Sequence, residues 1–309
     1  MKIAVTGAFG YSGRYISQRL LAAGHEVLTL TNSWTRENPF GSTVQALPFH
    51  FDQPSRLRDS LLGVGALINT YWVRFDHRGF SHSEAVANTK VLFQAAKDAG
   101  VRRIVHVSIT NPDLNSDLPY FRGKAELEAN LRALGVSYCI LRPAVLFGKE
   151  DVLINNIAWA LRHFPVFGVF GVGEYRLQPI HVDDLAAAAA AQALGNANGV
   201  VNAIGPETFS YKGLAETIKR TLGLRRLIIG VPPRLGYWAC RMVGWVVGDV
   251  VITRDEIQGL MEEKLYVAAP PLGQTKLSEW MIHHRETLGR RYTSELARRV
   301  DRSSRYRSN

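Results

Sequence analysis

The chain has 309 residues, of which 46% are hydrophobic and 21% are charged, and its formal net charge is +10 at pH 7. This composition excludes a disordered or fibrous protein, and the length suits one elaborated α/β domain or a large domain with a small one. Two distant cysteines, Cys139 and Cys240, exclude a disulfide framework and a metal-ligand spacing, so we expect a reduced, cytoplasmic compartment.

The first thirty residues predict a β-α-β unit with a glycine loop. An apolar strand at residues 2–6 is followed by Gly7, Gly10 and Gly13, and then by a helix pattern that leads into a strand at 26–31. In this position the first glycine permits a tight turn, the second lets the backbone approach a pyrophosphate, and the third lets the helix pack on the strand. The N-terminus of the helix favours phosphate, so the loop predicts a dinucleotide site.

The end of the second strand bears on which nicotinamide cofactor would bind. An acid there would hold the ribose 2′-hydroxyl of NAD, but Thr31 and Asn32 stand in its place, with Arg14 and Arg36 near in sequence. This pattern favours NADP over NAD, although both arginines could equally be ordinary surface residues. Asp52, after the third strand, is a candidate contact for the adenine amine or simply begins a turn.

The alternation of strands and helices continues to about residue 150. It predicts strands at 66–70, 103–108 and 137–142 and helices at 81–99 and 120–134. We therefore expect a Rossmann-type α/β fold, a doubly wound parallel sheet over residues 1–150, with later strands returning from 175–205. Residues 151–309 would form mainly a smaller cap over the carboxyl edge of the sheet and a basic tail.

Three residues predict acid–base chemistry near the sheet. Ser108 closes one strand, and Tyr120 and Lys124 lie four residues apart on one face of the next helix. A nearby ammonium favours the phenolate and lowers the tyrosine pKa, so Tyr120 would be the general acid/base. Ser108 would hold the substrate oxygen, and Lys124 could also bind the nicotinamide ribose. Lys124 falls on the apolar stripe of its helix, where an unpaired charge is costly, which favours function over a surface role.

Two features of the C-terminal half bear on partners. Residues 235–252 are apolar but are interrupted by Arg241 and Asp249, which favours a buried or interfacial helix over a membrane-spanning one. From Arg285 to the end, eight arginines face three acids, and we expect a frayed, solvated terminus rather than contact with nucleic acid or a membrane surface. No nucleic-acid signature accompanies this basic stretch.

Taken together, these motifs resemble the short-chain dehydrogenase/reductase superfamily, in its extended and atypical branch of epimerase/dehydratase-like proteins. The resemblance rests on residues 6–13, Ser108, Tyr120 with Lys124, and the stretches 141–143 and 179–186. It implies a nicotinamide cofactor held by the glycine loop and adjoining positions, and a substrate held by the cap. The further cofactor positions are Phe9, Tyr11, Asn32, Arg36, Asp52, Thr70 and Lys124, and the substrate positions are Tyr71, Asn155, Arg176 and Gln178.

Two functions follow from the resemblance. The first is an NAD(P)-dependent oxidoreductase or epimerase/dehydratase that acts on a small carbonyl or hydroxyl substrate through Tyr120. The second is a non-catalytic protein that binds NAD(P)(H) in a structural or redox-sensing role, similar to the nucleotide-binding accessory subunit of complex I and to NmrA-like proteins. The short interval between Ser108 and Tyr120, and the bulky aromatics at 69–75, depart from the family pattern and bear on catalysis rather than on binding.

Overall fold

The computed structural model describes residues 1–32, 38–76 and 80–299, which fall into two compact units. Unit 1 comprises Met1–Pro143 and Asp183–Ala203, and unit 2 comprises Ala144–Val182 and the chain from Ile204 onward. The first boundary therefore falls at Pro143 rather than at the predicted 150. The reason is that Pro143 ends a strand of the large sheet, whereas the next strand pairs within unit 2.

Unit 1 is built on a seven-stranded parallel sheet in the order β11-β6-β5-β4-β1-β2-β3. Its strands are β1 (Lys2–Thr6), β2 (Glu26–Leu30), β3 (Val44–Leu47), β4 (Ala66–Asn69), β5 (Arg103–Val107), β6 (Ser137–Pro143) and β11 (Gly199–Ala203). Every neighbouring pair runs parallel. The chain order reverses beside β1, so the carboxyl ends of β1 and β4 meet at the position where such sheets bind ligands. The predicted Rossmann-type fold is confirmed.

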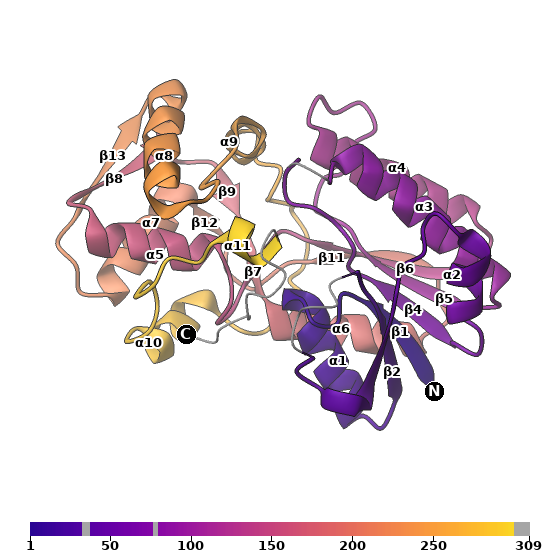
Figure 1. The fold of residues 1–309 in the computed structure, drawn as a ribbon. Helices are drawn as coiled ribbons and strands as arrows, with labels where there is room; N and C mark the ends of the chain where they lie inside the picture. Colours follow the sequence, from indigo (N-terminus) through magenta and orange to yellow (C-terminus); the bar gives the residue numbers. More distant parts are fainter. Residues whose placement is uncertain (33–37, 77–79, 300–309) are drawn as a thin grey trace. The chain divides into compact units, whose positions relative to one another are not determined.

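Helices cover both faces of this sheet (Figure 1). They are α1 (Tyr11–Ala22), α2 (Pro54–Ser60), α3 (His82–Asp98), α4 (Pro119–Ala133) and α6 (Val182–Leu194). Figure 1 shows α1 and α6 on one face and α2, α3 and α4 on the other. The predicted helix ends at Gly24, Gly100 and Gly135 are confirmed, since each glycine has a φ of +75° to +79°, which non-glycine residues rarely adopt. Leu28, Leu67 and Ile104 from three strands are almost fully buried beneath α2 and α3.

Unit 2 packs several short elements around its own apolar core. Its strands form three pairs: β7 (Val145–Phe147) with β10 (Pro179–His181), β8 (Val166–Phe170) with β13 (Leu227–Val231), and β9 (Arg176–Leu177) with β12 (Phe209–Ser210). Its helices are α5 (Leu153–His163), α7 (Tyr211–Thr221), α8 (Pro233–Val247), α9 (Arg254–Met261), α10 (Leu277–His284) and α11 (Glu295–Arg299). Phe147, Leu214 and Met281 are fully buried in this core, so the unit has a hydrophobic centre of its own.

The expectation of a frayed terminus from residue 285 onward is wrong for the stretch up to residue 297. Asp249, which follows α8, accepts hydrogen bonds from the Tyr292 hydroxyl and from the backbone N–H groups of Glu295 and Leu296, at 2.9 to 3.0 Å. The Asp249 side chain therefore caps α11 and ties the C-terminal segment to the end of α8. The sequence could not reveal this contact because its partners are more than forty residues apart.

Replacing Asp249 with alanine tests the importance of this cap. Asp249→Ala leaves a tyrosine hydroxyl and two backbone N–H groups without their acceptor, so we expect the free energy of unfolding to fall by about 1–3 kcal/mol. Urea unfolding of the full chain measures the change, with the exposed Glu174→Ala as a matched control that leaves stability unchanged. Equal stability of Asp249→Ala and wild type would contradict the assignment.

Candidate functional site

The glycine loop lies between β1 and α1 at the carboxyl edge of the sheet in unit 1. Gly7 has a φ of +67°, and its carbonyl accepts a hydrogen bond from the Gly10 N–H at 2.8 Å. A Cβ added to Gly13 would lie 2.2 Å from the Gly7 carbonyl oxygen, so only glycine fits there. α1 begins at Tyr11, and its N-cap residue is Gly10, which has no side chain to cap the helix. The N-terminus of a helix that follows such a loop is a favourable place for a phosphate.

The side chains of Phe9 and Tyr11 flank this loop in different ways. The Phe9 side chain is buried in unit 1, so any contact with a phosphate would come from its backbone. The Tyr11 ring lies edge-on to the Tyr15 ring, with 6.1 Å between centroids. The loop thus presents mainly backbone, and the residues present fit a dinucleotide pyrophosphate.

A buried polar network ties the loop to β4. The Thr6 hydroxyl donates to Asn69 Oδ1 at 3.0 Å and accepts from the Thr70 N–H at 2.7 Å. The Thr70 hydroxyl donates back to the Thr6 carbonyl at 2.6 Å and would be 3.6 Å from a Cβ on Gly7. The structure therefore brings Thr70 against the glycine loop, as its predicted place among the cofactor positions requires.

Tyr71, the next residue, belongs to an aromatic cluster with Phe49, Phe51 and Phe80. Its ring centroid lies 4.9 to 5.3 Å from the centroids of those three rings. Its hydroxyl accepts a hydrogen bond from Asn88 Nδ2 at 3.0 Å, and burial raises the pKa of Tyr71 above its usual range. Tyr71 is therefore a neutral phenol held within unit 1, and its predicted contact with a substrate stays a prediction.

The structure describes three of the four residues that were predicted to bear on the choice of cofactor. Asn32 Oδ1 accepts a hydrogen bond from the Phe49 N–H at 3.1 Å, which holds this residue against the chain after β3. The Arg14 guanidinium lies 5.8 Å from the Tyr15 ring centroid on α1. Asp52 is exposed in the turn before α2, where it accepts from Gln53. Arg36 lies outside the residues that the structure describes.

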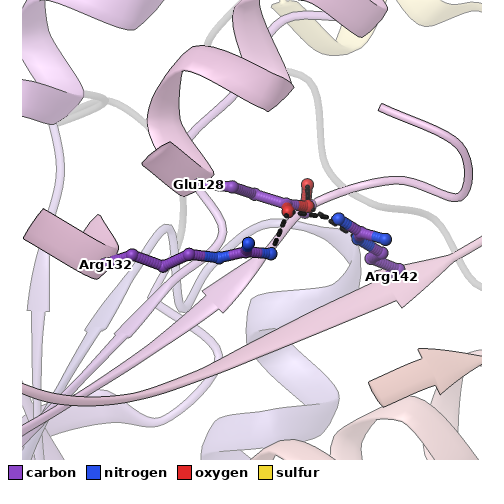
Figure 2. A network of polar contacts seen from close by, with 4 residues as sticks. Glu128, Arg132 and Arg142 are labelled. Atoms are coloured by element: carbon purple, nitrogen blue, oxygen red, sulfur yellow. Dashed lines mark hydrogen bonds and ion pairs between the residues drawn. The ribbon is translucent and has the colours of Figure 1, made fainter. Parts of the chain in front are cut away.

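Ser108, the predicted substrate-holding serine, is joined to a buried carboxylate. Its hydroxyl donates to Glu128 Oε1 at 2.7 Å. Arg142 Nε donates to the same oxygen at 2.9 Å, while Arg142 Nη2 donates to Glu128 Oε2 at 2.5 Å (Figure 2). Arg132 adds a bond to Oε2 at 3.2 Å from one turn further along α4. The network thus fixes Ser108, at the end of β5, to α4 and β6 through charge-assisted hydrogen bonds.

Tyr120 and Lys124 project from α4 towards Trp72, as their shared helix face predicts. The Tyr120 ring meets the rings of Trp72 and His82 edge-on, with centroids 5.5 and 5.6 Å apart. The Lys124 ammonium lies 4.3 Å from the centroid of the Trp72 ring and donates to the Val107 carbonyl at 2.8 Å. The structure therefore brings Tyr120 and Lys124 together around one indole, while the Ser108 hydroxyl points to Glu128.

Burial sets the proton affinity of Lys124. The side chain is only 2% exposed, and desolvation lowers the pKa of Lys124 from its ordinary value of 10.5 to about 7, although the Glu128 charge opposes the shift. His106 Nδ1 accepts a hydrogen bond from Asn69 Nδ2 at 3.1 Å, and burial lowers the pKa of His106 well below its usual value. Its Nε2 is buried without a hydrogen-bond partner among the described residues. A neutral His106 is therefore the form that the fold favours.

The three candidate substrate residues beyond position 150 all lie in unit 2 and bond within it. Asn155 is 2% exposed, donates to the Arg291 carbonyl and the Thr293 hydroxyl, and accepts from the Gly289 N–H. Gln178 is buried and accepts from the Val267 N–H at 2.9 Å. Because these amides already serve the packing of unit 2, its structure gives their substrate role no support.

Arg176 is the exposed member of that set. It forms a two-nitrogen ion pair with Glu263 at 2.6 and 2.8 Å, and its guanidinium stacks 3.8 Å from the Tyr266 ring centroid. Its predicted contact with a substrate stays a prediction. Among the described residues, no cluster of histidine, cysteine and acidic side chains could hold a metal ion.

The sequence interpretation missed Glu128, Trp72 and His82. Glu128 had a usable signal, since it continues the i, i+4 series of Tyr120 and Lys124 into the buried face of α4. Trp72 lies in the aromatic run that the sequence did mark, but its approach to Tyr120, like that of His82 at the start of α3, depends on tertiary packing against α4. Each missed residue contacts a residue that the sequence did single out.

The pH dependence of stability tests the burial of Lys124. Between its folded pKa of about 7 and its unfolded value of 10.5, the unfolded chain binds a proton that the folded chain lacks. The stability of wild type relative to Lys124→Met should therefore rise with pH across this window, and it should be lowest below pH 7, where the ammonium must be buried. Urea unfolding of both proteins across this pH window measures the difference, and a pH-independent difference would contradict the burial.

The comparisons with known proteins agree with this geometry. The NAD dependent epimerase/dehydratase family matches residues 3–204. The mitochondrial subunit 9 of the NADH dehydrogenase (ubiquinone) 1 alpha subcomplex is 27% identical in Rattus norvegicus, covering 82% of this chain and 70% of the relative. The Arabidopsis thaliana protein of that name is 31% identical, covering 69% of this chain and 56% of the relative. The NADP(H) complex of Citrobacter sp. triphenylmethane reductase is 20% identical, covering 92% of this chain and all of that one, with a TM-score of 0.73, and so shares the fold.

The glycine loop after β1 lies within the matched residues, and the predicted resemblance to epimerase/dehydratase-like proteins is confirmed. The chain belongs to the NAD dependent epimerase/dehydratase family.

Proposed function

We propose that this protein binds a nicotinamide dinucleotide on its glycine loop as a structural or redox-sensing ligand and does not use it for acid–base turnover. The observation that carries the proposal is the hydrogen bond from the Ser108 hydroxyl to Glu128, at 2.7 Å. A serine that polarises a substrate oxygen must turn its O–H towards the substrate. In this protein a buried carboxylate, itself held by two arginines, takes that O–H instead.

The energetics of the Glu128 network oppose a rotation of Ser108 towards a substrate. Hydrogen bonds to a charged acceptor are about twice as strong as neutral ones, and Glu128 is almost fully buried. If the serine hydroxyl turned away, the carboxylate would lose one of its donors in a place with little access to water. The Arg142 fork further fixes the direction of the carboxylate. Ser108 is thus better suited to bracing β5 against α4 than to catalysis.

The surroundings of Lys124 support the same conclusion. Its ammonium is covered by Trp72 and bonded to the Val107 carbonyl, so Trp72 would have to move before the ammonium could reach a ribose hydroxyl. Its pKa of about 7 also leaves it only partly charged at neutral pH, which weakens its ability to stabilise a phenolate at Tyr120. Trp72, one of the bulky aromatic residues after β4, therefore acts against catalysis at Lys124, while the glycine loop stays able to bind a dinucleotide.

The names of the relatives support a protein partner as well as a ligand. The rat and Arabidopsis relatives are named as subunits of a larger dehydrogenase. The match spans little more than half of the Arabidopsis relative. By analogy, we propose that the ligand-bound form of this chain acts through a protein partner rather than through a product.

We also propose that the ligand is NADP(H) rather than NAD(H). No acid occupies the end of β2, where Thr31 is followed by Asn32, whose side-chain oxygen accepts from the Phe49 N–H. Without a carboxylate there, nothing at this position would repel a 2′-phosphate. Arg14, in the first turn of α1, directly follows the glycine loop and is a candidate cation for that phosphate.

A second candidate function is an NAD(P)-dependent oxidoreductase or epimerase that uses Tyr120 as general acid/base on a small carbonyl or hydroxyl substrate. The observation that favours it is the pair of Tyr120 and Lys124, one turn apart on α4 and both against Trp72. A lysine with a lowered pKa is also a known means of proton exchange near neutral pH. Two measurements on the same purified protein, nucleotide binding and substrate turnover, distinguish the two functions.

Titration of NADPH and NADH into the full chain, followed by nucleotide fluorescence, tests binding. We expect both to bind, NADPH more tightly, and Gly13→Ala to weaken binding roughly tenfold or more, since its Cβ would displace the Gly7 carbonyl. Gly199→Ala is the matched control, because a Cβ there meets nothing within 4 Å. Binding that Gly13→Ala leaves unchanged would overturn the site.

Turnover is then measured as NADPH oxidation with a panel of aldehydes, ketones and quinones. We expect wild type and Tyr120→Phe to give the same low rate, because the proposal gives Tyr120 no proton to transfer. A rate that falls roughly tenfold or more in Tyr120→Phe, with NADPH affinity unchanged, would establish the second function and overturn the first.

A further inference from the structure

Helix α8 of unit 2 is apolar on both of its faces. Its inner face packs on β8 and β13 through Gly236, where an added Cβ would lie 2.8 Å from the Phe170 ring. Tyr237 and Cys240, on the same face, pack against the core of the unit. Since this face alone anchors the helix, the residues on its opposite face are not needed for the core.

The opposite face of α8 carries five exposed apolar side chains at helical spacing. We call this set the α8 apolar face, and it consists of Leu235, Trp238, Met242, Trp245 and Val246. The exposure is large, at 72% for Met242 and 89% for Trp245. A helix that is hydrophobic all round is normally buried, and a contiguous exposed patch of this kind marks an interaction site.

The patch extends from the helix onto the neighbouring strand. Side chains on one face of a strand recur every second residue, so Leu227 and Ile229 share the face of Val231. Val231 contacts the position of Gly236 on α8, which places all three on the α8 side of β13. Leu227 is 67% exposed and Ile229 is also exposed. Figure 1 shows α8 lying beside β8 and β13, in agreement with this continuity.

Basic side chains border the α8 apolar face. Exposed Arg234 and Arg241 lie on one flank of the helix, and the Arg241 guanidinium lies 5.2 Å from the centroid of the Trp238 ring. Arg225 is exposed beside the start of β13. The sequence of α8 contains no acidic residue, and Asp249 beyond its end is buried and occupied by the cap of α11. The border is therefore positive.

We propose that the α8 apolar face docks on the headgroup region of a membrane that contains anionic lipids. Tryptophan prefers the membrane–water interface, and arginines beside an apolar helix face attract anionic headgroups. With 15 residues, α8 is about 22 Å long, which is too short to cross the hydrocarbon core, so it would lie in the interface. In agreement, no helix among the described residues has the length and apolarity that crossing a bilayer requires.

Charge favours this occupant over a second copy of the chain. A symmetric dimer through the α8 apolar face would bring two basic borders into one interface, and like charges across an interface are unfavourable. The whole chain also carries a net charge of +10, which opposes self-association and favours an anionic surface. The apolar face and its basic border are thus both satisfied by an anionic lipid surface.

Vesicle flotation of the full chain tests the proposal. We expect the protein to float with mixed phosphatidylcholine–phosphatidylglycerol vesicles, more weakly with phosphatidylcholine alone, and less in high salt. The double variant Trp238→Ser with Trp245→Ser should lose flotation, and Arg234→Gln with Arg241→Gln should weaken it roughly tenfold. The matched control is Leu62→Ser with Leu114→Ser, which removes two exposed apolar side chains from unit 1 and should leave flotation unchanged.

Three results would overturn the proposal. The first is the absence of flotation with the anionic vesicles, and the second is flotation that the tryptophan double variant retains. The third is a dimer, seen by size-exclusion chromatography with light scattering, that the tryptophan double variant alone dissociates, because the face would then be an interface between copies. Urea unfolding of the tryptophan double variant, with the same midpoint as wild type, shows that its fold is intact.

Discussion

The carboxylate of Glu128 joins three elements of unit 1 through charge-assisted hydrogen bonds. It binds Ser108 at the end of β5, Arg142 on β6 and Arg132 on its own helix, α4. Glu128 is almost fully buried, so loss of Arg142, the less exposed of its two arginines, would leave the carboxylate poorly compensated and would destabilise unit 1. Because Tyr120 and Lys124 project from the same helix, the network also fixes where these two residues lie. The chemistry that Tyr120 and Lys124 can perform therefore depends on a network that also holds β5, β6 and α4 together.

The glycine loop is independent of that contact and keeps its own geometry. Gly13 lets α1 approach β1 so closely that its N-terminus faces the edge of the sheet, and Thr6 and Thr70 hold the loop against β4. In the function that we propose, the dinucleotide loop is kept, while the bulky side chains after β4 and the carboxylate partner of Ser108 serve packing rather than catalysis. Unit 2 adds a separate surface on α8, whose function we infer to be contact with a membrane.

Local patterns predicted most of unit 1. The loop spacing placed Gly13 on the face of α1 that meets β1, and the i, i+4 pair placed Lys124 towards the interior of α4. The partner of Ser108 was not predictable, since Glu128 lies twenty residues away and its direction is set by Arg142 on another strand. The apolar run at residues 235–252 predicted a buried or interfacial helix but not which face stays exposed, because both faces are apolar.

A crystal structure of the full chain with NADPH bound would decide whether Ser108 braces the fold or serves catalysis. We expect the pyrophosphate at the N-terminus of α1, with the Ser108 hydroxyl still on Glu128 and Trp72 still over Lys124. A structure in which Ser108 turns to the nicotinamide beside the Tyr120 hydroxyl, with Lys124 on the ribose, would contradict the proposed function and favour the catalytic one. A dinucleotide bound anywhere other than the glycine loop would contradict the proposed binding site itself.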